Sequence, residues 1–476
     1  AIATQLPGDL LQRGADIPVD FRAWLFAFSV TAMTAAAFVL VPMFSARKIE
    51  LSSALGPGAR TGRSATESRA RTTLLIGQVA MTLVLVFGAA LFLKSFAALT
   101  QAPLGFEPAN RITMRTTVGP PRYVTPAAIS GYVDELLAQA RAIPGVHSAA
   151  AGSSSPLGSG PLALLAPAGE PSVPAGGETR AILRTVTPGY FQTVGIPILR
   201  GRAFSADDHA TGPRLAIVNE TAARRLFGDL DAVGRQVDFR PGPRSAAWMQ
   251  KPGAVLIAGV AANIKEVGVN EVDFADLYLL WSQAPAPSIE LIVRAAPSAS
   301  IDAQALKRAT AAVDPAVPVV SVSTLEQRVS RALQNDRFNM MLISSFAAIA
   351  VLLAIVGIYG AIAYVVEGRR REFGVRLALG ARPRQLISLA LWQAGRVGIA
   401  GGLIGVAAAL ILSRALGDAL YLVPGSHNGL LYGVTTLDPL MLGAAFIAIV
   451  ALALGAGLIP ARRVGRVNPM LALRNE

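Results

Sequence analysis

The feature that most constrains this chain is a set of five long apolar stretches, each about 20 or more residues long. A helix of that length crosses a hydrocarbon layer about 30 Å thick. Core helices of soluble proteins seldom stay apolar on every face over such lengths. The sequence therefore predicts an α-helical membrane protein with about five transmembrane helices. The stretches are residues 21–45, 74–93, 340–366, 397–416 and 437–459.

The arginines predict how these spans are oriented. Residues 46–73, 367–396 and 460–476 are rich in arginine, whereas residues 417–436 contain neither Lys nor Arg. The positive-inside rule places the three basic segments in the cytoplasm, and five spans make that arrangement self-consistent. The predicted order is an outward tail 1–20, a span 21–45, a cytoplasmic linker 46–73, a span 74–93, an outward domain 94–337, a span 338–366, a cytoplasmic segment 367–396, a span 397–416, an outward loop 417–436, a span 437–459 and a cytoplasmic tail 460–476.

Charge and cysteine content narrow the functional classes. The net charge of +13 is concentrated in the short cytoplasmic segments, where membrane topology and anionic inner-leaflet lipids explain it. Nucleic acid is therefore not predicted as a partner; the lipid bilayer is. The chain has no cysteine, which removes disulfides, thiolate chemistry and cysteine-bound zinc from consideration.

The outward domain is predicted to be a mixed α+β domain, because short β-rich segments alternate with amphipathic helical patterns. The expected strands are residues 111–118, 179–186, 215–219, 254–260, 277–281 and 289–294. The expected helices are residues 127–143, 220–227, 301–313 and 324–333. Two stretches rich in Gly, Pro and Ser, residues 152–177 and 240–253, are expected to be mobile loops or subdomain junctions.

Catalytic and metal-binding patterns are weak. The three histidines, His147, His209 and His427, lack partners at metal-ligand spacing. His209 follows two aspartates, which favours a solvated acidic turn over a weak metal site. The serine run 153–155 lacks the glycine-flanked elbow of a nucleophile and is interpreted as linker. No Gly-Lys-Ser/Thr occurs, so the polypeptide is not expected to hydrolyse ATP itself, and no catalytic, cofactor or metal residue is predicted.

An internal repeat links the first and last spans. The first span ends in Pro42 and runs on to Ala54 and Leu55, and the last ends in Pro460 and runs on to Ala472 and Leu473 with the same spacing. Such an echo predicts that residues 1 to about 60 are the tail of a preceding homologous half. The alternative is that any exit from a membrane span carries Pro and Arg.

The segment between the third and fourth spans carries the most informative local motif. Glu372 and Arg376 are four residues apart, a favourable helical pair, and Phe373, Leu377 and Ala381 share one face. These residues predict a short amphipathic helix on the cytoplasmic side. Such a helix either lies on the lipid surface or docks a cytoplasmic partner.

Two features of the fourth apolar run bear on how it packs. Arg396 is expected at the inner interface with its side chain snorkelling, the alternative being an ion pair inside the bundle. Gly401, Gly402, Gly405 and Ala409 form a small-residue stripe suited to tight helix packing.

Residues 369–381 resemble the coupling region of MacB/FtsX-type ABC transporter permeases. The terminal segment 459–474 and the outward segments 189–204 and 217–227 are also similar to that family. The resemblance implies an FtsX-like four-helix core plus one helix of a preceding repeat, with a large MacB-like periplasmic domain. It is strongest to duplicated permeases whose ATPase is encoded separately, although most of a first half is missing from this sequence.

That resemblance implies a multi-pass protein of the bacterial inner membrane that passes ATP-driven motion to its periplasmic domain, for efflux or mechanotransmission. Its implied partners are a cytoplasmic ATPase dimer and a periplasmic adaptor or envelope protein, with ATP and Mg bound only through the ATPase. Two alternatives remain: an FtsX-like scaffold that regulates cell-envelope enzymes without transport, and a membrane-anchored enzyme, which requires an acid/base or metal cluster. The implied ATPase contacts are Arg371, Glu372, Phe373, Gly374, Arg376, Ala378, Leu379, Gly380 and Ala381.

Overall fold

The chain forms two compact units in the computed structural model. One is a helical unit, Ala1–Ala97 with Asp336–Glu476, and the other is an α+β unit, Ala98–Asn335. The structure describes residues 25, 28–29, 60–158, 160–169, 178–242, 253–265, 274–297, 299, 301–368, 382–420 and 438–464.

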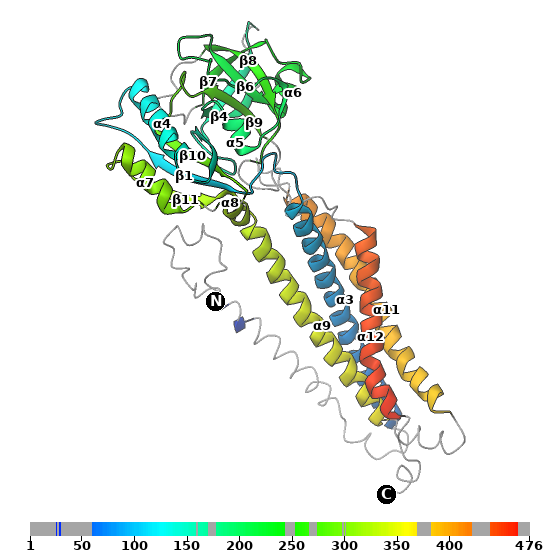
Figure 1. Cartoon of the computed structure of the whole chain (residues 1–476). Helices are drawn as coiled ribbons and strands as arrows, with labels where there is room; N and C mark the ends of the chain where they lie inside the picture. Colours follow the sequence, from blue (N-terminus) through cyan, green and yellow to red (C-terminus); the bar gives the residue numbers. More distant parts are fainter. Residues whose placement is uncertain are drawn as a thin grey trace. The chain divides into compact units, whose positions relative to one another are not determined.

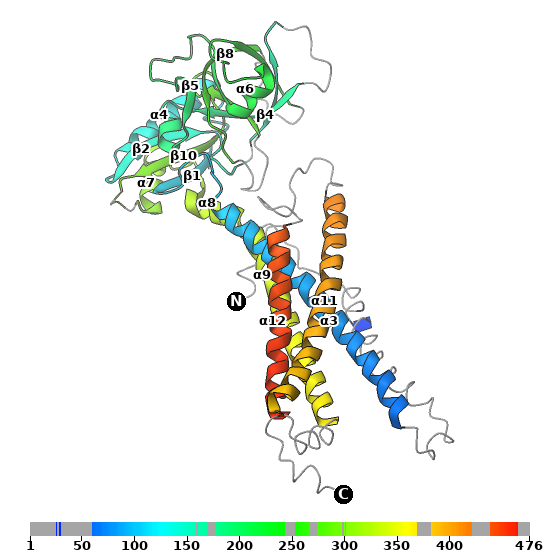
Figure 2. The ribbon, with the colours of Figure 1, turned by 90° about the vertical axis from the view of Figure 1, so that its right-hand side faces the viewer.

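Four long helices make up the described part of the helical unit (Figures 1 and 2). They are α3 (Arg60–Thr100), α9 (Gln334–Gly368), α11 (Pro383–Leu420) and α12 (Pro439–Val464). Each contains a segment long and apolar enough to cross a membrane: Thr72–Thr100, Gln334–Glu367, Arg384–Ala415 and Pro439–Arg462. Four of the predicted membrane helices are thereby confirmed. The predicted span 21–45 and the repeat around Pro42 lie almost entirely outside the described residues.

The described residues of the α+β unit form eleven strands, and the pairing of these strands divides the unit into two lobes. The four-stranded lobe has the antiparallel order β11 (Val319–Thr324), β1 (Arg111–Thr117), β10 (Ser288–Ala295) and β2 (Val146–Gly152). It also carries α4 (Pro126–Arg141), α7 (Ala303–Val313) and α8 (Leu325–Ala332).

The second lobe is a closed barrel, because its strand pairings return to their starting point. The ring runs β4 (Thr179–Val186), β3 (Leu162–Pro167), β7 (Gln236–Pro241), β8 (Gly253–Ala261), β6 (Leu215–Asn219) and β9 (Ala275–Leu280), and β9 pairs in parallel with β4. Strand β5 (Ile198–Gly201) joins β8, and α6 (Glu220–Phe227) completes this barrel lobe. Closure leaves no free edge among the six ring strands.

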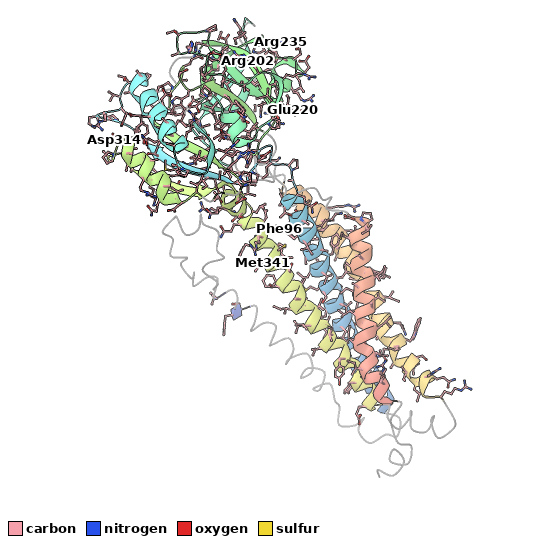
Figure 3. The ribbon with its side chains drawn as sticks, in the orientation of Figure 1. Phe96, Arg202, Glu220, Arg235, Asp314 and Met341 are labelled. Carbon is pink, nitrogen blue, oxygen red and sulfur yellow. The ribbon has the colours of Figure 1, made fainter. Side chains whose placement is uncertain are left out.

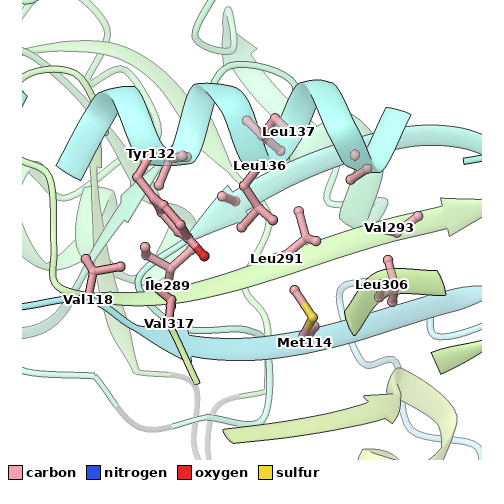
Figure 4. Packing of buried hydrophobic residues seen from close by; sticks show 14 of the residues in the cluster. Met114, Val118, Tyr132, Leu136, Leu137, Ile289, Leu291, Val293, Leu306 and Val317 are labelled. Atoms are coloured by element: carbon pink, nitrogen blue, oxygen red, sulfur yellow. The ribbon is translucent and has the colours of Figure 1, made fainter. Parts of the chain in front are cut away.

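Helix α4 shows how the four-stranded lobe builds its core. Thr125 caps the helix by accepting from the amide of Ala128, and Pro126 occupies the first turn. The apolar residues at helical spacing are all buried, as the sequence predicts, and they pack on alternate residues of β10 such as Leu291 and on Met114 of β1 (Figure 4). The buried residues of α4 are Ile129, Tyr132, Val133, Leu136, Leu137 and Ala140.

The predicted outward strands and helices are present, while the predicted loop 152–177 is partly wrong. Strand β3 lies inside that stretch and is a full member of the barrel, paired with β4 and β7. Residues 152–158, the first part of the predicted loop, do form the junction between the lobes. There β2 and β4 share one residue pair, Gly152 with Val186. In the second predicted loop, residues 240–253, β7 ends at Pro241 and β8 begins at Gly253, and residues 243–252 lie outside the described part.

Ser153–Ser155 lie in the irregular segment between β2 and β3, as a linker does, but this segment is packed into the domain. Ser154 and Ser155 are buried, and each accepts a hydrogen bond from an arginine distant in sequence. The hydroxyl of Ser153 accepts from the amide of Thr185 on β4. All three serines therefore make contacts where the two lobes pack together.

Candidate coupling site

The predicted coupling residues lie between two described helices. Helix α9 ends at Gly368, and α11 begins at Pro383 with a defined cap: the Arg382 amide donates to the side chain of Gln385 at 3.1 Å, and the Gln385 amide donates to the Arg382 carbonyl at 2.9 Å. The intervening segment 369–381, which holds all nine predicted ATPase contacts from Arg371 to Ala381, is outside the described residues. Their role stays a prediction.

The helices that flank this segment meet at one glycine of α12. A Cβ built on Gly457 would lie 2.8 Å from the Cβ of Ala394 on α11 and 2.9 Å from the Cδ1 of Ile362 on α9. Both distances are too short for ordinary contact, so only glycine permits this approach. Helices from both sides of the segment therefore touch α12 at the same residue.

The small-residue stripe of α11 faces two neighbours, which confirms the predicted tight packing. Gly401 and Gly405 approach α3: their Cβ positions lie 2.7 Å from the Cβ of Val79 and 2.8 Å from the carbonyl oxygen of Ala80. Gly402 approaches α12, where its Cβ position lies 2.7 Å from the ring of Phe446. Backbone approach of this kind supplies dispersion contacts where lipid provides no hydrophobic driving force.

Helices α3 and α9 are joined by polar contacts inside the bundle. The buried hydroxyl of Thr82 lies 2.8 Å from the carbonyl of Gln78 and 3.3 Å from the carbonyl of Ala350 on α9. A Cβ on Gly357 of α9 would lie 2.8 Å from the side-chain oxygen of Gln78. The hydroxyl therefore spans the two helices that lead into and out of the α+β unit along the chain.

An ion pair marks one end of the bundle. Lys94 of α3 contacts the carboxylate of Asp438 at 2.5 Å, and the same carboxylate accepts from the amides of Leu440 and Met441 at the start of α12. Asp438 thus acts as the N-cap of α12 and ties that cap to α3. Arg396 is exposed on α11, but it lies inside the apolar segment Arg384–Ala415 and not before its start, as was expected. Snorkelling of its side chain stays a prediction.

The acidic turn near His209 is held by an arginine. Arg202 donates to both oxygens of Asp208, at 2.7 and 2.8 Å, and the Ser205 amide donates to the same carboxylate at 2.8 Å (Figure 3 labels Arg202). The Arg202 hydrogen bonds lower the pKa of Asp208 to about 2. Within the described ranges, no group of three or more His, Cys, Asp or Glu side chains is placed to hold a metal ion.

A shallow pocket of about 330 Å³ lies between α4, β2 and α5 (Tyr190–Val194). Arg141, His147, Gln192 and Thr193 are among its lining residues. Arg141 already donates to the carbonyl of Ala149.

His427, the third histidine of the sequence, lies outside the described residues.

Two family models match the chain and together cover most of it. Residues 72–335 match the MacB-like periplasmic core domain, and residues 344–469 match the FtsX-like permease C-terminal domain. The first match begins at the start of the apolar part of α3 and ends between α8 and the body of α9.

Several curated proteins are similar over the same region. A macrolide export ATP-binding/permease protein MacB of Bdellovibrio bacteriovorus is 26% identical over 61% of this chain and 43% of its own length. A pyoverdine export ATP-binding/permease protein PvdT of Pseudomonas syringae pv. tomato is 25% identical over 59% of this chain and 40% of its own. The ABC transporter permease YknZ of Bacillus subtilis is 23% identical over 63% of this chain and 71% of its own. The chain thus matches less than half the length of the MacB and PvdT relatives.

Proposed function

Because this chain belongs to the family of ABC transporter permeases with a MacB-like periplasmic core and an FtsX-like permease domain, we propose that it transmits the ATP-driven motion of a separate cytoplasmic ATPase dimer to its α+β unit. The cytoplasmic segment 369–381 receives the motion, α9 and α11 carry it across the bilayer, and the α+β unit delivers it in the periplasm. The protein is a multi-pass protein of the inner membrane.

The observation that carries this proposal is the contact of three helices at Gly457. Ile362 of α9 and Ala394 of α11, one on each side of the coupling segment, both touch that glycine of α12. A force applied between α9 and α11 therefore acts on the whole bundle, since packed helices shift as rigid elements. In this proposal, a docked ATPase applies the force through the short amphipathic helix.

The ATPase contacts of the proposal are the nine residues from Arg371 to Ala381. Glu372 and Arg376 supply charge on that helix, and Gly374 and Gly380 permit close backbone approach or end the helix. ATP and Mg are bound by the partner in this proposal, and this chain binds no cofactor of its own. Residues 1–476 contain no Gly-Lys-Ser/Thr, so this proposal places the nucleotide site outside them.

Export of a hydrophobic or peptide-like molecule with a periplasmic adaptor is the form of activity that we favour. The MacB relative is named as a macrolide export protein and the PvdT relative as a pyoverdine export protein. A non-transporting FtsX-like scaffold uses the same coupling, so the match to the FtsX-like domain alone supports either role. The two differ in what the α+β unit binds, an adaptor or cargo in one case and a cell-wall hydrolase in the other.

Co-purification of the full-length protein with candidate ATPases tests the coupling assignment. We expect the double variant Glu372→Ala/Gly380→Trp to lose the ATPase while it still inserts into the membrane. The matched control is Glu135→Ala/Gly131→Trp, which makes the same substitutions at exposed positions of α4 where the Gly131 Cβ meets open space. Undiminished ATPase binding by the Glu372/Gly380 variant contradicts the assignment.

A further inference from the structure

A buried cluster of charged and polar side chains lies between the two lobes of the α+β unit. Its first member is Glu290 on β10, which is fully buried although its neighbour Ile292 points to the same apolar face. Arg115 lies directly opposite on β1 and donates to Glu290 at 2.8 Å. Arg328 of α8 donates to the other carboxylate oxygen. Glu290 thus holds β1, β10 and α8 together from the four-stranded lobe.

Residues 153–158 carry the cluster across to the barrel lobe. Arg328 also donates to the hydroxyl of Ser155 at 2.5 Å, so one guanidinium holds both the sheet and this loop. The adjacent Ser154 hydroxyl accepts from Arg184 of β4 at 3.0 Å, and the carbonyl of Gly158 accepts from the same arginine at 3.1 Å. Two neighbouring serines therefore connect arginines from different lobes.

The cluster ends at the first turn of α6. The fully buried Arg184 donates to Asp276 of β9 at 2.7 Å, and the other oxygen of Asp276 accepts from Asn219 at 3.0 Å. Asn219 is the N-cap of α6: its side-chain oxygen accepts from the amides of Ala222 and Asp276, both at 2.9 Å. A series of polar contacts, joined at Ser154 and Ser155 by the peptide bond between them, thus runs from α8 to α6.

The starting point of this series, α8, is firmly attached and lies next to a membrane helix in the chain. Thr324 and Gln327 form a reciprocal capping box at its N-terminus. Leu325 is fully buried in the core between the lobes, and Arg328 follows it on the same face. Only Leu333 separates the end of α8 from the start of α9. The two helices are therefore joined by one residue of chain.

Burial makes the cluster respond as a unit. Removing one partner from a buried ion pair leaves an uncompensated charge in a low-dielectric setting, which is strongly unfavourable. The lobes share a single strand pair between β2 and β4, so the polar cluster supplies directional contacts that the apolar core between them lacks. A movement of Arg328 must therefore carry Ser155 and its neighbours along or break buried interactions.

We propose that the series Arg328, Ser155, Ser154, Arg184, Asp276 and Asn219 is an interlobe relay that passes movement of α8 to the barrel lobe and to the N-terminus of α6. The inference rests on the proposed function for the source of that movement. These residues act through one another and are positioning residues. The relay assigns the barrel lobe, and α6 in particular, as the part of the periplasmic unit that responds to the membrane helices.

Hydrogen exchange of the full-length protein in detergent tests the relay without any ATPase. The readout is exchange in peptides covering α6 and β9, where the amides of Ala222 and Asp276 depend on Asn219. We expect Arg328→Met to speed exchange there by about tenfold. The control Arg331→Met makes the same change at an exposed position of the same helix and is expected to leave α6 unaffected.

Two milder variants test the relay even if Arg328→Met does not fold. Ser155→Ala removes the link to Arg328 but keeps the ion pair with Glu290, and it too is expected to speed exchange at α6. Ser153→Ala, whose hydroxyl accepts only a β4 amide, is expected to affect β4 and to spare α6. Exchange that increases only in α8 and β10, with α6 unchanged in both Arg328→Met and Ser155→Ala, overturns the relay.

A second arm separates the relay from the proposed function. In the complex with a co-purified ATPase, ATP is expected to change exchange at α6 in the wild type and in Ser153→Ala, and to leave it unchanged in Ser155→Ala. ATPase binding should be equal in all three. An ATP effect on α6 that persists in Ser155→Ala overturns the relay as the route of the movement. Failure of every ATPase to bind the wild type contradicts the proposed function. In that case the exchange measurement without ATPase decides the relay.

Discussion

Replacing Gly405 with alanine is expected to destabilise the helix bundle. A Cβ at this position would lie 2.8 Å from the carbonyl oxygen and 3.1 Å from the Cα of Ala80, and 2.9 Å from the Cβ of Leu83. The first distance is 0.6 Å below the 3.4 Å at which ordinary contact begins. Two of the atoms belong to the α3 backbone and the third to a Cβ, so no rotamer change relieves the overlap, and α11 must move away from α3.

The magnitude follows from that displacement. A gap of about 0.5–1 Å forfeits a quarter to a half of the dispersion energy of each affected contact, and overpacking of well-packed cores typically costs about 1–3 kcal/mol. We expect a loss in this range for Gly405→Ala. Gly401 faces α3 one turn away and meets Val79 at 2.7 Å, so one shift of α11 relieves both positions, and the double variant should lose less than the sum of the two single losses.

Reversible unfolding in mixed micelles measures this free energy. Gly443→Ala on α12 is the matched control, because a Cβ there meets nothing within 4 Å; its stability should equal or slightly exceed that of the wild type. Equal stability of Gly405→Ala and Gly443→Ala refutes the argument that glycine at Gly405 is required by close packing.

Three further predictions concern both units. Leu136→Ala, which empties a fully buried site under α4, should lower the unfolding free energy by about 2–5 kcal/mol in denaturant titration. Arg202 depresses the pKa of Asp208 to about 2. The stability that the Asp208 carboxylate contributes is therefore complete above its unfolded pKa near 3.8 and is lost as pH falls through about 2. Because Arg202 is half exposed, the Asp208→Asn variant should change the unfolding free energy at pH 7 by less than about 1 kcal/mol and should reduce the loss of stability at acid pH. In a double-mutant cycle, Lys94→Ala and Asp438→Ala should couple only weakly because the pair is solvent-screened. Asp438→Ala should be the more damaging single change because it also removes the cap of α12.

Local sequence patterns were sufficient where burial and propensity agree. Strands β4 and β6 are β-rich over their whole length and match the predicted ranges. The apolar stripe of α4 and the bounds of α6 were equally clear. The spans follow from length and apolarity, which need no knowledge of tertiary contacts.

Strands with weak local signals were missed. β2 reads Val-His-Ser-Ala-Ala-Ala-Gly with one β-branched residue, and β3 has none and ends in proline, so both resemble loop or helix. β11 was missed as well, although it has four β-branched residues among six. Closure of the barrel through the parallel pair β4 and β9 joins residues far apart in sequence, which no local pattern predicts.

The functional residues divide in the same way. The small-residue stripe on α11 was visible because its members recur at helical spacing. Gly457 was not singled out, since its contacts on α9 and α11 are set by tertiary packing. The serines of the relay do lie in a loop, but their burial was not predicted because it depends on Arg184 and Arg328, which are 30 and 173 residues away. The acidic Asp438 before Pro439 did carry a helix-start signal.

We expect the α+β unit and the coupling segment to lie on opposite sides of one membrane. The chain has no cysteine, so single-cysteine variants report one site each. Gln139 on α4 and Arg382 at the start of α11 are both exposed in their units. With a membrane-impermeant maleimide, Gln139→Cys should label in intact spheroplasts and Arg382→Cys only after the membrane is permeabilised. Labelling of both sites from the same side contradicts the account.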